Sequence, residues 1–135
     1  ANFEAENNWI MLRYADVLLM MAEAVGPSPR AWDLIDRVRD RSLPAPQFDV
    51  DRSGGGESFY RQLLRERRVE LAFENHRWPD LKRFEQYIDG VAEARVGEEL
   101  ADVSGFNLLY PIPQREVDVA DLEQNAGYAG GGGGS

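Results

Sequence analysis

Cysteine is absent from the 135 residues of this chain, and histidine occurs once, as His76. Without cysteine, disulfides, cysteine-based zinc sites and thiol nucleophiles are excluded. A lone histidine has no second histidine or cysteine with which to build a metal site or a nucleophilic pair. We therefore expect no metal, no cofactor and no catalytic centre, and we interpret His76 as a residue at a junction between helices.

Positive charge is also scarce, since 15 Lys and Arg stand against 24 Asp and Glu and the net charge is −9. Phosphate backbones are bound by clustered Lys and Arg, so the composition argues against a nucleic-acid partner. With so many carboxylates, pairs occur at every spacing by chance, and no glycosidase-type pair can be singled out. Gly54–Gly56 is followed by Glu57 and not by the Lys-Ser or Lys-Thr of a phosphate-binding loop.

Uninterrupted apolar runs are missing too. The most apolar stretch, Trp9–Val25, contains Arg13, Asp16 and Glu23. It is therefore expected to be a buried core helix and not a membrane span. No signal peptide is visible at Ala1–Asn8, and no cysteine is present to carry a lipid. We expect contact with a membrane only through a lipid anchor that is not among these residues.

The spacing of apolar residues predicts helices throughout the chain. Ser28 is a suitable N-cap and Pro29 a suitable first helical residue, so a second helix starts directly after Gly26-Pro27 ends the first. Two helices joined by a short turn over about 33 residues have the size of a tetratricopeptide-type hairpin. The remaining predicted helical segments are Glu57–Asn75, Pro79–Ile88 and a short turn within Gln114–Gln124. Gly90–Ala101 is a further candidate helix, which Gly97 weakens.

The C-terminal part of the chain lacks the apolar spacing of a helix and contains closely spaced prolines. Leu108–Pro113 must be extended, because each proline disfavours helix at the residue before it. We interpret it as an apolar strap over the helices. The predicted fold class is therefore all-α, with tetratricopeptide-like helical hairpins and a C-terminal extended, proline-containing strap. Residues 1–128 are expected to form one helical domain, and residues 129–135 a Gly/Ser linker or an engineered tail.

A charge within an apolar stripe is the most unusual feature of the sequence. On a helical wheel of about 100° per residue, the side chains within about 40° of Arg67 are apolar or aromatic. They are Tyr60, Leu63, Leu64 and Leu71. A buried guanidinium must be paired and hydrogen-bonded. The same helix has a second predicted apolar patch, which would place it between two neighbours. This patch comprises Phe59, Val69 and Phe73.

Four carboxylates are expected to neutralise Arg67. Asp16 and Glu23 lie on the first helix, and Glu70 and Glu74 follow Arg67 by one and two turns of its own helix. We predict a structural ion network of these residues, without a catalytic role. The alternative for the first helix is a solvated stripe, because its three charged residues project within an arc of roughly 80°.

Three runs of sequence stand out together. The first is Arg13–Ala24; the second is Glu66–Glu74 with His76-Arg77-Trp78 and Asp80–Arg83; the third is Leu109–Gln114 with Gln124-Asn125 and Gly127-Tyr128. In this order they resemble the C-terminal half of SusD/RagB-like proteins. Asn75 departs from the pattern, since the family usually has glycine there. The family's N-terminal half, with its lipidated cysteine, is not among these residues.

The resemblance implies a binding protein of the Bacteroidetes outer-membrane surface that is not an enzyme. Such proteins deliver glycans, or in some cases peptides, to a TonB-dependent, SusC-like transporter. On this interpretation residues 1–128 are a SusD/RagB-like C-terminal helical domain. Half of a helical-repeat protein exposes apolar surface, so we also expect some self-association.

Two functions remain as alternatives. The first is capture of an oligosaccharide or peptide ligand, for which Trp9 and Tyr87 are the candidate exposed aromatic residues. Trp32 and Trp78 are assigned to the core instead, from their positions on the inner stripes. The second function is a helical protein–protein module that docks on the transporter or another partner without binding a ligand itself.

Overall fold

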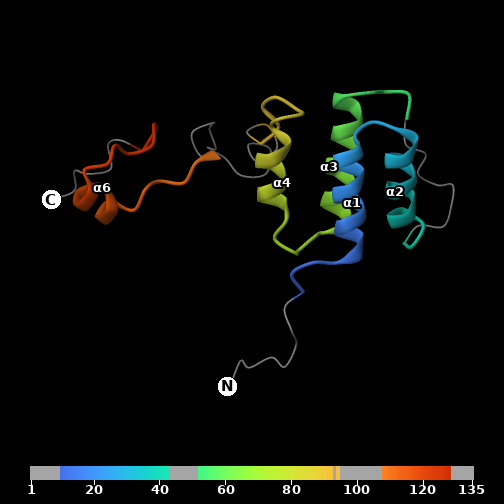
Figure 1. Cartoon of the computed structure of the whole chain (residues 1–135), viewed down its shortest axis with the longest axis horizontal. Helices are drawn as coiled ribbons and strands as arrows, with labels where there is room; N and C mark the ends of the chain where they lie inside the picture. The colour runs from blue at the N-terminus through green and yellow to red at the C-terminus, as the bar shows by residue number, and fades with distance from the viewer. Residues whose placement is uncertain (1–9, 43–51, 93, 95–107, 129–135) are drawn as a thin grey trace, which may run out of the picture. The chain divides into compact units, whose positions relative to one another are not determined.

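Figure 1 shows the computed structural model, which describes residues 10–42, 52–92, 94 and 108–128. Within these ranges the chain forms five helices and no strand, so the all-α prediction is confirmed for the described residues. The helices are α1 (Tyr14–Val25), α2 (Pro29–Arg39), α3 (Glu57–Glu70), α4 (Arg77–Phe84) and α6 (Gln114–Ala120). The chain divides into two compact units, Ala1–Asp80 and Leu81–Ser135.

In the first unit, α1 packs against both α2 and α3, and the three helices lie side by side in Figure 1. Their facing sides supply a continuous set of buried apolar residues. The largest of these that are fully buried are Phe59, Leu19, Ile35 and Leu63. The rings of Trp32 and Phe59 meet in a T-shaped arrangement at a centroid distance of 5.3 Å, a preferred geometry for aromatic pairs. Trp32 therefore belongs to the core, as predicted.

The connection between α1 and α2 follows the sequence signals closely. Gly26 has a φ of 72°, a conformation that favours glycine, and its N–H bonds to the carbonyls of Ala22 and Glu23. Ser28 caps α2, since its hydroxyl accepts a hydrogen bond from the N–H of Ala31 at 3.2 Å. Pro29 opens the helix. The predicted stop and start are both confirmed.

The first helix is shorter than predicted, because α1 begins at Tyr14 and not at Trp9. Arg13 precedes it in an extended conformation, with φ −117° and ψ 155°. The Arg13 side chain is bonded to Glu70 and Glu74 at the end of α3. This attachment holds the residue out of the helix. The apolar spacing of Ile10–Leu12 extended the prediction too far.

The third helix also ends early, at Glu70 and not at Asn75. Phe73 and Asn75 both have positive φ, at 66° and 63°, so the chain turns through the left-handed region twice. Asn75 is thus in a left-handed conformation, which glycine adopts most easily. The second apolar patch was wrong, because Val69 is 69% exposed and Phe73 is 103% exposed. The turn removes Phe73 from the helical face that the wheel assigned to it.

The fourth helix is displaced towards the N-terminus relative to its prediction, since α4 covers Arg77–Phe84. Beyond it, the Glu85 carboxylate accepts hydrogen bonds from the N–H groups of Gly90 and Ala92, at 2.9 and 2.6 Å. These bonds bend the chain back within the second unit. Among the described residues of this unit, the buried side chains are Leu81, Phe84, Ile88, Val91 and Ala92.

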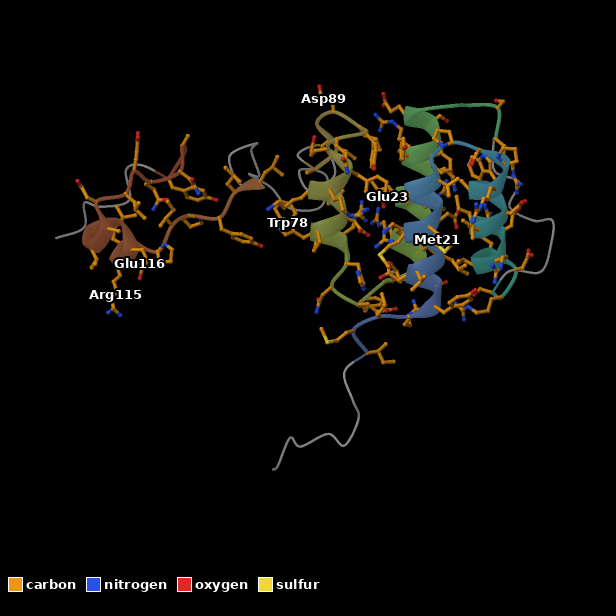
Figure 2. All side chains as sticks on the ribbon, viewed as in Figure 1. Met21, Glu23, Trp78, Asp89, Arg115 and Glu116 are labelled. Carbon is orange, nitrogen blue, oxygen red and sulfur yellow. The ribbon has the colours of Figure 1, made fainter. Side chains whose placement is uncertain are left out.

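The C-terminal residues of the second unit are held together by side-chain to backbone bonds. The Gln124 amide bonds to Ile112 twice, accepting from its N–H and donating to its carbonyl, each at 2.8 Å. Asn125 donates to the Tyr110 carbonyl at 2.7 Å, and the Tyr128 hydroxyl to a neighbouring carbonyl at 2.9 Å. The third run of sequence singled out above thus consists of two segments that hydrogen-bond to each other. Arg115 and Glu116 of α6 are exposed (Figure 2).

Candidate functional site: ion clusters and recesses of the first unit

Arg67 is bonded to two buried carboxylates. Its Nη1 donates to Oδ1 of Asp16 at 2.8 Å, and its Nε donates to Oδ2 of Asp80 at 2.9 Å. All three side chains are 5% exposed or less. A cation with an anion on each side meets the pairing requirement of a buried charge. The cluster joins α1, α3 and the first turn of α4.

The structure therefore brings one of the four expected carboxylates to Arg67, together with one that was not expected. Glu23, labelled on α1 in Figure 2, is buried but does not pair with Arg67. Glu70 and Glu74 pair with Arg13 instead. Asp80 was missed because the helical wheel ignores the chain reversal between α3 and α4. The Asp80–Arg83 run was already recognised as distinctive, which is the signal that could have found it.

A second cluster follows from the spacing of three glutamates. Glu66 and Glu70 stand four residues apart on α3, so the helix places them one above another, and Glu74 lies in the turn beyond its end. Arg39 of α2 pairs with Glu66 at 3.3 Å, and Arg41 just beyond α2 pairs with Glu70 at 2.8 Å. We call these three glutamates the acidic stripe. Its four-residue period is visible in the sequence, but the arginines that face it come from other elements.

Arg13 completes this second cluster at the end of α3. Its guanidinium lies 2.9 Å from a Glu70 oxygen and 2.7 Å from a Glu74 oxygen, and it also donates to the Glu70 backbone carbonyl at 2.7 Å. A cation at that carbonyl satisfies a helix-end acceptor and opposes the negative end of the helix dipole. The hydrogen bonds from Arg13 hold the pKa of Glu74 below its ordinary value.

A recess of about 370 Å³ opens between α1 and α2, and we call it the Tyr14 recess. Its lining residues are Arg13, Tyr14, Ala15, Leu18, Arg37, Val38 and Arg41. Tyr14 is 64% exposed. The Arg37 guanidinium donates to the Tyr14 hydroxyl at 2.8 Å, and its central carbon is 5.7 Å from the ring centroid. The recess thus combines an accessible aromatic ring with a fixed guanidinium.

Two other recesses lie in the first unit. One of about 450 Å³ includes Trp32, but Arg52 covers the ring at 5.5 Å and the indole is only 8% exposed. The other, of about 180 Å³, lies beside Phe73 and includes Asn75 and His76. His76 stands directly before α4, at the helix junction predicted for it.

Of the two predicted ligand-binding aromatic residues, Tyr87 is described by the structure and does not line any of the three recesses above. Trp9 is outside the described residues. Tyr87 is half-buried and packs edge-on against Phe84 at a centroid distance of 5.7 Å. Sequence reasoning missed Tyr14 and Arg37 as a pair. The only available signal was Arg37 on the polar side of the second helix, and nothing in the sequence aligned it with Tyr14.

The described part of the chain has features of neither a metal centre nor a membrane span. No group of three or more acidic or histidine side chains there could hold a metal ion. No helix in those ranges is both long enough and apolar enough to span a bilayer. What the clusters and the Tyr14 recess offer is fixed charge and an aromatic surface, which are suited to binding.

Comparison with known proteins gives consistent matches. A family model described as the SusD family matches residues 2–128. SusD-like protein P38 of Formosa agariphila is 31% identical over 135 residues, covering 91% of this chain and 25% of that protein. SusD-like protein P2 of the same organism is 34% identical over 123 residues, covering 85% of this chain and 22% of that protein.

A solved structure extends the match to three dimensions. The crystal structure of a SusD homolog from Bacteroides thetaiotaomicron superposes with a TM-score of 0.59 at 34% sequence identity. The match covers 87% of this chain and 26% of that one. The chain thus spans about a quarter of the length of the proteins it matches.

Proposed function

Because the chain belongs to the SusD family, whose members are binding proteins and not enzymes, we propose that it is part of a glycan-binding component of a nutrient uptake system. The observation that carries this proposal is the family match over residues 2–128. The acidic balance of the chain, with a net charge of −9, does not favour a nucleic-acid partner.

The partner that we propose is a TonB-dependent, SusC-like transporter at the outer-membrane surface. Family membership supports this location, with attachment through a lipid anchor outside these residues. The ligand is an oligosaccharide, with a peptide as the alternative. Residues 1–128 would form the C-terminal helical domain of such a protein, with tetratricopeptide-like hairpins and a proline-containing strap, and residues 129–135 a linker or tail.

Titration of this chain with a panel of oligosaccharides tests the proposal. The three tryptophans give an intrinsic fluorescence signal, and calorimetry provides a second readout that needs no nearby indole. We expect a saturable change for at least one glycan. A series of short peptides in the same assay separates peptide capture from glycan capture.

The second candidate function is a protein–protein module that docks on the transporter without binding a ligand itself. The three packed helices of the first unit favour it, because helical surfaces of this kind commonly bind other proteins. Pull-down with a purified SusC-like transporter measures this docking directly. If the chain binds the transporter but gives no binding signal with any oligosaccharide or peptide tested, ligand capture is rejected for this chain.

A further inference from the structure

The charged residues that line the Tyr14 recess all have the same sign. They are Arg13, Arg37 and Arg41, and no carboxylate is among the lining residues. This is unusual for a chain of net charge −9, in which acidic groups outnumber basic ones. Guanidinium groups that are concentrated at one place on an acidic protein create a locally positive potential, which favours the binding of an anion there.

The three arginines differ in how far their charges are already neutralised. Arg13 is bonded to both Glu70 and Glu74, and Arg41 shares Glu70. Arg37 has no carboxylate partner among the described residues, and its only side-chain bond there is to the Tyr14 hydroxyl. Most of its N–H donors therefore remain available. A positive charge that the protein does not neutralise can be neutralised by a ligand.

Tyr14 fixes the position of this free charge. Its hydroxyl accepts from Arg37 at 2.8 Å and its ring lies beneath the guanidinium, so the arginine is held before any ligand arrives. The ring itself is 64% exposed. Sugar rings stack on aromatic faces, and guanidinium groups bind carboxylates and sulfates through paired hydrogen bonds. The volume of about 370 Å³ lies within the range of small-ligand sites.

We propose that the Tyr14 recess binds the anionic group of an acidic oligosaccharide, with Arg37 holding the charge, Arg41 at its side and Tyr14 contacting the sugar ring. The assignment rests on the proposed glycan-binding function and adds the class of glycan. The shared chemistry is a carboxylate or a sulfate ester on a sugar, and both are planar or compact oxyanions that a guanidinium can pair with.

The test compares three probes by calorimetry with the 135-residue chain: oligogalacturonate, a sulfated galactan oligosaccharide and a neutral oligomer of equal length. We expect at least one acidic probe to bind about tenfold or more tightly than the neutral one, and this preference to fall as salt is raised. Arg37→Gln should abolish the preference, and Arg37→Lys should restore only part of it because lysine lacks the paired donors. Arg37 is exposed, so neither change disturbs the core.

Arg30→Gln is the matched control, since Arg30 is an exposed arginine of α2 that does not line the recess. It should leave the preference unchanged. Equal binding of neutral and acidic probes would overturn the proposal that the ligand is an acidic glycan, and it would leave the proposed glycan-binding function standing. An acidic preference that survives Arg37→Gln would overturn the site. Binding of none of the probes, or of acidic peptides only, would overturn this inference, and the wider panel then decides whether the glycan function also fails.

Discussion

At the scale of single residues, Arg67 shows why a charge stands in an apolar stripe. It is 3% exposed, and its guanidinium contacts the buried carboxylates of both Asp16 and Asp80. A buried pair of this kind need not add net stability relative to an apolar replacement, because desolvation offsets the attraction. Removing one partner is different, since it leaves buried charge without compensation.

Arg67→Ala is therefore expected to destabilise the chain severely. The change removes the guanidinium that Asp16 and Asp80 share, and breaking a buried pair typically costs about 3–5 kcal/mol. Thermal and urea unfolding measured by circular dichroism check this, with Arg65→Ala as the control because Arg65 is an exposed residue on the same helix. A variant that melts like the parent chain would show that Arg67 is not the structural centre of the first unit.

At the scale of elements, the helix boundaries that depend on local sequence signals were predicted correctly. The helix boundaries that lie at long-range contacts were not. The Gly26 stop and the Ser28 cap are local and were correct. The predicted start of α1 and end of α3 were wrong, and the structure joins these two places through the long-range attachment of Arg13 to Glu70 and Glu74. A helical wheel contains no information about a residue 61 positions away.

The same limit applies to the candidate site. Arg67 and Asp16 were singled out from periodicity, whereas Asp80 reaches Arg67 only because the chain reverses at a turn containing two positive-φ residues. Tyr14 and Arg37 meet only because α1 and α2 pack side by side at a particular register. Residue type and helical periodicity predict which charged side chains lie on an apolar face. The pairing of those groups is decided by tertiary packing.

The attachment of Arg13 to α3 should make stability depend on pH through Glu74. The folded pKa of Glu74 is lowered, so its ion pair stabilises the fold above the ordinary glutamate pKa of about 4.3 and is lost as pH falls through the lower folded value. Glu74→Gln should therefore lower Tm at neutral pH, and the difference from the parent chain should shrink as pH falls through the lowered pKa of Glu74. Glu116→Gln is the control, because Glu116 is exposed on α6. A Tm difference that stays constant with pH would contradict the prediction.

At the scale of the whole molecule, many large apolar side chains of the described residues are exposed to solvent and not packed in the core. They include Met11 at 83% and Phe73 at 103%, together with Ile10, Leu12 and Val69. Phe73 is also held at a φ of 66°, which is uncommon for a bulky residue. Since the chain spans 25% of the SusD-like protein P38, we interpret these side chains as surface suited to further contacts.

The chain should therefore self-associate at high concentration, with Phe73 as a principal contact. Burying one phenylalanine contributes about 1.5–3 kcal/mol, which corresponds to roughly a tenfold to hundredfold change in an association constant. Multi-angle light scattering over a concentration series should show a mass that rises with concentration, and Phe73→Ser should shift that rise to higher concentration. The substitution removes no core packing, because the side chain is fully exposed, so the melting temperature of the dilute monomer should not fall. Val119→Ser on α6 is the matched exposed control and should shift the association less than Phe73→Ser, because valine offers less apolar surface to bury. A strictly monomeric parent chain at high concentration would show that this apolar surface does not drive association between copies.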